Sequence, residues 1–353
     1  MDGSTQPTTA SPADLPGTAD ALDDQLSAPT PAAAEALAHL QGDLLVLGVA
    51  GKMGPTLARM AQRAFAAAGS KQRVIGVARF SDPAVQRKLD GWGIETIACD
   101  LLDEAALARL PAAGNVMFMA GMKFGSTGNE PLTWAMNAHL PALVCRRYRG
   151  SRIAAFSTGN VYGLSPLSGG GSIEADAANP VGEYAMSCLG RERIFQHFSR
   201  ADGTPVSILR LNYATELRYG VLVDLAQKVW GGVPVDLGMG NVNVIWQGDA
   251  NAMALASFAG AASPSFVLNI AGPETLSVRR VCQQFARRMG REAQFVGTEA
   301  PDALLNNGQL GHRLYGYPRV GAEQMILWTA DWVMRGGPTL NKPTHFEARS
   351  GKF

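Results

Sequence analysis

The sequence contains few cysteines and few histidines. It has four cysteines, none of them in a Cys-x-x-Cys pair, and five histidines that do not cluster near them. Neither a disulfide framework nor a zinc site is therefore expected, and free thiols suit a reducing compartment. We expect a cytoplasmic protein without a bound metal. Its cysteines are Cys99, Cys145, Cys188 and Cys282.

The sequence also lacks an excess of charge and any long apolar run. It has 31 basic and 30 acidic residues, a net charge of +1, and no basic stripe, so neither nucleic acid nor an anionic membrane is an expected partner. No stretch approaches the roughly 18 apolar residues of a membrane-spanning helix. Residues 1–30 have neither the basic nor the apolar region of a secretory signal. Their Ala, Pro, Thr and Ser composition predicts a mostly disordered leader.

Hydrophobic residues, by contrast, make up 46% of the chain, enough for a large core. Short apolar runs at 43–48, 73–77, 95–99, 116–119 and 152–156 alternate with helical spacing at 55–68, 104–110 and 132–147. This alternation predicts an α/β fold, a Rossmann-type doubly wound parallel sheet. We expect the leader at 1–30, a dinucleotide-binding domain at 31–211, and a smaller substrate-binding lobe at 212–335, interleaved with the first. A polar segment at 336–353 is expected to pack as an extended arm.

A glycine-rich turn, residues 48–54, follows the first expected strand and reads Gly-Val-Ala-Gly-Lys-Met-Gly. Such a turn lets the backbone approach a pyrophosphate, and the next helix presents its N–H groups and the positive end of its dipole. The same glycines could also serve packing alone. Their position between a strand and an amphipathic helix favours a dinucleotide site.

The Gly-x-x-Gly-x-x-Gly spacing resembles the extended short-chain dehydrogenase/reductase family of NAD-dependent epimerases and dehydratases, such as UDP-galactose 4-epimerase. Further segments match that family in order, so the resemblance extends over roughly 44–333. They are 100–101 (Asp-Leu), 119–123 (Met-Ala-Gly-Met-Lys), Asn137, 156–163 (Phe-Ser-Thr-Gly-Asn-Val-Tyr-Gly), 209–212 (Leu-Arg-Leu-Asn), 244–250 and 268–274.

The resemblance implies a nicotinamide dinucleotide and assigns a set of residues to it. The second strand ends in Ala78-Arg79, where an NAD-preferring member would carry an acid. A guanidinium there suits a 2′-phosphate, so NADP(H) is favoured and NAD(H) stays possible; Arg79 could also be a plain surface residue. The cofactor set is Gly48, Gly51, Lys52, Met53, Gly54, Arg79, Asp100, Leu101, Met119, Ala120, Gly121, Lys123, Asn137, Tyr184 and Cys188.

The resemblance also implies Thr158 and Tyr184 as the catalytic pair, with Lys123, Asn160 and Asn212 facing the substrate. Family members carry a lysine four residues after the tyrosine, but this chain has Cys188. A tyrosine titrates near pH 10, so without that cation Tyr184 should donate a proton yet be a poor base. Cys188 is either an apolar filler or a reactive thiol. Lys123 is the first candidate for a replacement charge and Arg191 the second.

Together these features predict an NAD(P)-dependent oxidoreductase or epimerase/dehydratase acting on a sugar, a sugar nucleotide or a related polyol or carbonyl compound. Loss of the lysine keeps open a catalytically reduced cofactor-binding sensor or scaffold. A structural interaction protein that kept only the fold is a third possibility. The resemblance further implies a homodimer formed through helices at about 132–147 and 184–200.

Overall fold

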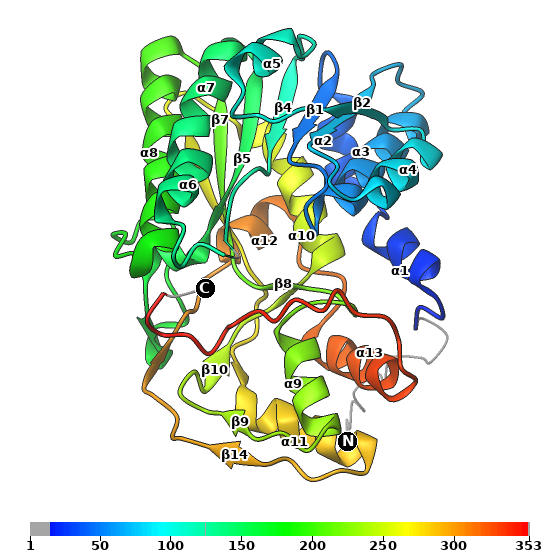
Figure 1. Ribbon diagram of the computed structural model, residues 1–353, viewed down its shortest axis with the longest axis vertical. Helices are drawn as coiled ribbons and strands as arrows, with labels where there is room; N and C mark the ends of the chain where they lie inside the picture. Colours follow the sequence, from blue (N-terminus) through cyan, green and yellow to red (C-terminus); the bar gives the residue numbers. More distant parts are fainter. Residues whose placement is uncertain (1–14, 124, 352–353) are drawn as a thin grey trace, which may run out of the picture.

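Seven strands form one parallel sheet in the order β12-β7-β5-β4-β1-β2-β3. The protein is described here from a computed structural model, which covers residues 15–123 and 125–351 (Figure 1). The predicted Rossmann-type sheet is therefore confirmed. Its strands are β1 (Leu44–Leu47), β2 (Val74–Ala78), β3 (Glu95–Ala98), β4 (Asn115–Phe118), β5 (Arg152–Thr158), β7 (Val206–Leu211) and β12 (Phe266–Ile270).

Alternating side chains of the strands serve two separate helical layers, because successive residues of a strand point to opposite faces. Leu44 and Val46 pack with the layer that contains α3, whereas Leu45 and Leu47 pack with the layer that contains α8. The first layer holds α2 (Pro31–Ala38), α3 (Gly54–Ala67), α4 (Pro83–Gly91) and α10 (Gln247–Ala256), and the second holds α5 (Glu104–Arg109), α7 (Leu140–Arg147) and α8 (Gly182–Asp202).

Two elements that follow residue 212 in the chain, α10 and strand β12, belong to the sheet domain. The second lobe's own core surrounds Trp246, Phe285 and Trp332. Its main helices are α9 (Val221–Trp230), α11 (Val278–Met289) and α13 (Ala322–Met334). Shorter elements are β8 (Ala214–Thr215), β9 (Val235–Asp236), β10 (Asn241–Val242), β11 (Ile245–Trp246), β13 (Leu276–Ser277), β14 (Phe295–Val296), β15 (Asp302–Ala303) and α12 (Gln309–Tyr315).

The expectation of a disordered leader is wrong for its second half. Helix α1 (Ala19–Leu26) begins at Thr18, whose side chain caps it by accepting from the Ala21 N–H. Leu22 and Leu26 lie on one face and are fully buried in the second lobe's core. The prediction failed because it used the average composition of residues 1–30, which does not reveal two leucines on one face of a short helix. Residues 1–14 lie outside the described residues.

No helix within the described ranges has both the length and the apolar character to span a membrane.

Candidate functional site

The glycine-rich turn lies where the carboxyl ends of β1 and β4 meet. Gly48 has φ +86°, and a Cβ there would lie 2.7 Å from the Ala120 nitrogen. A Cβ on Gly54 would lie 2.1 Å from the Val49 oxygen. Both glycines are thus required by close backbone approach. Helix α3 begins directly after Met53, but the Gly54 N–H donates to the Gly51 oxygen at 3.2 Å and Pro55 has no N–H. What the helix offers a phosphate is therefore the positive end of its dipole rather than a set of free N–H groups.

Lys52 projects from this turn toward the second lobe. Its Nζ lies 3.2 Å from the centroid of the Tyr219 ring. Burial, followed by repulsion from Lys123 and Lys342, lowers the pKa of Lys52 to about 6, although Asp224 and Glu216 act in the opposite sense. Burial also lowers the pKa of Lys123, to about 8. Because an anion would favour the charged form of both amines, the region suits a pyrophosphate.

A π-helical turn holds Asn137 beside the β4 loop. The expected helix at 132–147 is divided into α6 (Glu130–Trp134), the π turn η2 (Ala135–His139) and α7, and the Leu140 N–H donates to the Ala135 oxygen. Pro141 explains this break, because its ring would clash with the carbonyl of residue 137. That carbonyl instead accepts from Arg191 Nε at 3.4 Å.

The amide group of Asn137 is engaged by the protein at both ends. Its Oδ1 accepts from the Met122 N–H at 2.9 Å and from Arg191 Nη2 at 2.5 Å. Its Nδ2 donates to the Met122 oxygen and to Ser187 Oγ. Gly121 leaves the necessary room, since a Cβ there would lie 2.3 Å from Arg191 Nη2. These hydrogen bonds let Asn137 position the loop after β4, and its expected contact with a cofactor stays a prediction.

Thr158 and Tyr184 lie together, at the end of β5 and in the first turn of α8. Their side chains are hydrogen-bonded to each other. Burial raises the pKa of Tyr184 well above its usual value, with Cys188 adding to the rise, and Arg191 only partly opposes this. Lys123 Nζ lies 5.9 Å from the Tyr184 ring centroid. The pair therefore offers a protonated phenol.

Cys188 has no exposed surface and packs against Val161 and Tyr162. Burial raises the pKa of its thiol, so the reactive thiolate is disfavoured. The side chain also forms a hydrogen bond with Tyr184. A buried, protonated thiol favours the filler interpretation over a reactive thiol, and the expected contact of Cys188 with a cofactor stays a prediction.

Of four further predicted site residues, Arg79 and Asp100 are exposed, whereas Asn160 and Asn212 form hydrogen bonds within the protein. Arg79 is exposed at the end of β2, and Asp100 is exposed just after β3. Asn160 hydrogen-bonds Thr158 Oγ1 through its backbone N–H at 3.2 Å. Asn212, in contrast, is buried, and its Nδ2 donates to Asn243 Oδ1 at 2.6 Å and to the Leu304 oxygen. These bonds hold Asn212 within the second lobe, and its expected contact with the substrate stays a prediction.

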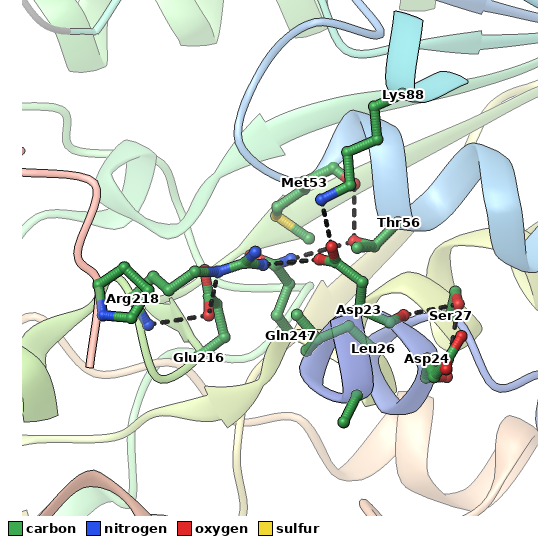
Figure 2. A network of polar contacts seen from close by, with 12 residues as sticks. Asp23, Asp24, Leu26, Ser27, Met53, Thr56, Lys88, Glu216, Arg218 and Gln247 are labelled. Carbon is green, nitrogen blue, oxygen red and sulfur yellow. Dashed lines mark hydrogen bonds and ion pairs between the residues drawn. The ribbon is translucent and has the colours of Figure 1, made fainter. Parts of the chain in front are cut away.

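An ion-pair network beside the glycine turn was missed by the sequence analysis (Figure 2). The Asp23 carboxylate of α1 is buried and pairs with Lys88 of α4 and with Arg218, whose Nη2 lies 2.9 Å away. Arg218 also pairs with Glu216. The network joins α1, the sheet domain and the loop after β8. Its residues are far apart in the chain, so no local pattern indicated it.

A cavity of about 760 Å³ lies at the opposite end of the sheet, where the strands begin. It is lined by Gln41, Gly114, Gly150 and Pro205 among others. These residues precede β1, β4, β5 and β7. Ligands of open α/β sheets bind at the carboxyl ends of strands, so we place the site at the glycine turn instead.

The family resemblance is confirmed by comparison with known proteins. Residues 44–214 match the model of the NAD dependent epimerase/dehydratase family. A search of curated proteins finds no match.

Solved structures share the fold at low sequence identity. A UDP-glucose 4-epimerase of Thermus thermophilus, complexed with NAD, is 20% identical with a TM-score of 0.68, and the match covers 83% of this chain and 99% of that one. The dTDP-glucose 4,6-dehydratase DesIV of Streptomyces venezuelae, with NAD and TYD bound, is 20% identical with a TM-score of 0.68, covering 83% and 97%.

Proposed function

We propose that this protein is an NAD(P)-dependent oxidoreductase or epimerase/dehydratase that acts on a sugar or a related polyol or carbonyl compound. The observation that supports this most is the hydrogen-bonded Thr158–Tyr184 pair, placed beside a dinucleotide-type glycine turn. Its free and buried cysteines fit a cytoplasmic location.

The residues around the glycine turn fit a nicotinamide dinucleotide. Gly48, Gly51 and Gly54 would hold its pyrophosphate, with the ammonium of Lys52 beside them. Asp100 would lie near adenine, and Arg79 near a 2′-phosphate, which favours NADP(H) over NAD(H). When bound, the nicotinamide supplies or accepts the hydride.

Tyr184 would donate the proton of the reaction. Its phenol stays protonated near neutral pH, so it can give a proton to a carbonyl oxygen while Thr158 orients that oxygen. Alcohol oxidation needs a phenolate, and burial disfavours one. We therefore expect carbonyl reduction to proceed at neutral pH and alcohol oxidation to rise only well above pH 8.

Two experiments test this proposal separately. Calorimetry with NAD and NADP on Gly51→Asp and Gly51→Asn tests the cofactor site. A Cβ at Gly51 would be 3.3 Å from the Gly48 oxygen, so both side chains meet the same modest crowding. Only the aspartate should abolish binding by repelling the pyrophosphate. Equal binding by both variants would refute the placement.

The second experiment is a pH–rate profile across a panel of sugars and polyols. Tyr184→Phe should abolish turnover, whereas Tyr317→Phe, at a 69% exposed position, should not. Cys188→Lys should move the rise in oxidation to lower pH. Fast oxidation at pH 7 that ignores both Tyr184→Phe and Cys188→Lys would exclude the Tyr184 mechanism.

The second candidate function is a cofactor-binding sensor or scaffold with little turnover. The buried cysteine at the position of the family lysine favours it. Tight cofactor binding without turnover of any sugar or polyol in the panel would support this alternative.

A further inference from the structure

Arg191 of α8 is a buried arginine without an acidic partner. It is 6% exposed, and its guanidinium carbon lies 5.5 Å from the centroid of the Phe118 ring. The neighbouring Glu192 forms an ion pair with Arg210 instead. No Asp or Glu in the part of the chain that the structure describes forms an ion pair with Arg191. Arginines are seldom buried unless they are paired, because removing a charge from water is costly. This charge therefore needs another reason.

Neutral groups of the candidate site hold the guanidinium in place. Its Nη1 donates to the Phe156 oxygen at 2.7 Å, near the end of β5. Its Nη2 and Nε donate to the side-chain and backbone oxygens of Asn137. Asn137 Nδ2 donates in turn to Ser187 Oγ, which donates to the Tyr184 oxygen, each at 2.9 Å. Arg191 is thus connected to the strand and to the helical turn that carry the catalytic pair.

The geometry of α8 directs this charge toward Tyr184. Residues 184, 188 and 191 recur at helical spacing, so their side chains share one face of the helix. Long side chains of a helix lean toward its N-terminus, which is the direction of Tyr184 from Arg191. The electrostatics agree, because burial and Cys188 raise the pKa of Tyr184 whereas Arg191 lowers it.

The other ionisable groups around this part of α8 do not supply the same charge. They are Cys188 and the exposed Glu183 on α8, Lys123 after β4, the exposed His139 on η2, Tyr162 on the 3-10 helix η3 (Gly159–Tyr162), and the Glu192–Arg210 pair. Burial raises the pKa values of Cys188 and Tyr162, so both are neutral. Burial lowers the pKa of Lys123 to about 8. At about pH 10, where a tyrosine ionises, only about 1% of such an amine is charged, whereas an arginine keeps its charge.

We propose that Arg191 takes over the electrostatic role of the lysine that Cys188 replaces, and that its guanidinium stabilises negative charge on the Tyr184 oxygen. The inference rests on the proposed function. When the phenol proton passes to the substrate oxygen, the electron pair of the broken O–H bond stays on Tyr184, and a fixed cation nearby stabilises it. Arg191 is a positioning residue, because it acts through Tyr184.

The test measures the ionisation of Tyr184 directly and needs no substrate. The full chain is prepared with 3,5-difluorotyrosine, whose phenol is more acidic than that of tyrosine, and fluorine NMR spectra are recorded as the pH is raised. The Tyr184 signal is the one that Tyr184→Phe removes. Arg191→Gln, which keeps a polar side chain without the charge, should raise the apparent pKa of Tyr184 by about one unit. Arg191→Lys, which keeps the charge, should raise it by less than about half a unit.

A merely structural role would affect both Arg191 variants without separating their titrations. Equal titration of Tyr184 in the wild type, Arg191→Gln and Arg191→Lys would overturn the inference. A wild-type Tyr184 that does not ionise before the protein unfolds would overturn it too, because no cation then stabilises the phenolate.

Two further variants serve as comparisons. Arg193→Gln removes a charge from the same helix at an exposed position, where Arg193 donates to Gln196, and should leave the titration unchanged. Lys123→Gln tests the competing cation. If Arg191→Gln does not fold, Lys123→Gln decides. An unchanged Tyr184 titration then supports Arg191 as the cation, and a rise of about one unit overturns it.

Failure of the proposed function gives a different result. A chain whose Tyr184 responds to the charge of Arg191 but that turns over no sugar or polyol refutes the enzyme proposal alone. A chain that oxidises a sugar or polyol with the same pH profile in the wild type and in Arg191→Gln keeps the enzyme proposal and refutes the role of Arg191.

Discussion

Cofactor binding should be coupled to proton uptake by Lys52. The pKa of this lysine is lowered to about 6 in the protein without ligand, mainly by burial. At pH 7.5 only about 3% of it carries a proton. A pyrophosphate beside the amine favours the ammonium, so binding near pH 7.5 should take up close to one proton per cofactor.

The size of the effect follows from the same pKa. Between about pH 7 and pH 9 the protonated fraction falls tenfold per pH unit. If binding needs the ammonium, the dissociation constant should rise about tenfold per unit, or about 1.4 kcal/mol. The same pKa shift also predicts how the stability of the protein without a cofactor depends on pH. Because the unfolded state binds this proton up to about pH 10 and the folded state does not above about pH 6, the Lys52 contribution to stability should increase as pH rises through that window.

Calorimetry in phosphate and in Tris at pH 7.5 measures the uptake, because these buffers release protons with different enthalpies. Lys52→Gln should abolish both the buffer dependence and the pH slope. Lys71→Gln changes an exposed lysine beyond the end of α3 and should leave both unchanged. A dissociation constant that is constant from pH 6 to 9, with equal heats in the two buffers, would refute the argument.

Three further outcomes are expected. Arg79→Asp should weaken NADP binding by about 2 kcal/mol and leave NAD binding equal or stronger, since a carboxylate repels the 2′-phosphate; an unchanged NADP/NAD ratio in calorimetry would contradict this. Asp23→Asn should lower the free energy of unfolding by about 2 kcal/mol in urea melts, because it removes a buried charge from two cations, whereas Asp20→Asn on the exposed side of α1 should have little effect. Light scattering should give a dimer, twice 37.3 kDa, formed where Leu132 and Met186 are exposed; a monomer at micromolar concentration would exclude it.

Local patterns were sufficient to predict the sheet and the glycine turn. The inner strands are short and mostly apolar, as strands buried on both faces need to be, whereas the edge strand β3 (Glu-Thr-Ile-Ala) is partly exposed. The break at η2 could have been predicted as well, since Pro141 cannot continue a regular helix. The sequence favours Lys123 over Arg191 as the replacement charge, because Arg191 lies one turn beyond Cys188. Helical spacing nevertheless returns residue 191 to the face of 184 and 188, and Asn137 holds it there.

Other features depend on contacts between distant segments. Asp23 and Arg218 are joined only in the folded chain, and the course of the arm is set by Asp224 and Asp302. The amide of Asn212 lies within the second lobe because Asn243 accepts from it. No periodicity in the sequence indicates such pairings, and average composition wrongly predicted disorder for the second half of the leader.

The position of β12 has a consequence for how the chain reaches its fold. The segment that matches the family model ends at residue 214, just after β7. The partner that covers the free edge of β7 is β12, which follows only after α9 and α10. Excised at residue 214, the segment would present β7 as a bare apolar edge, open to pairing with other chains. A nascent chain has the same exposed edge until β12 emerges, and is prone to aggregate until then. The unit that folds is therefore longer than the unit that the family defines.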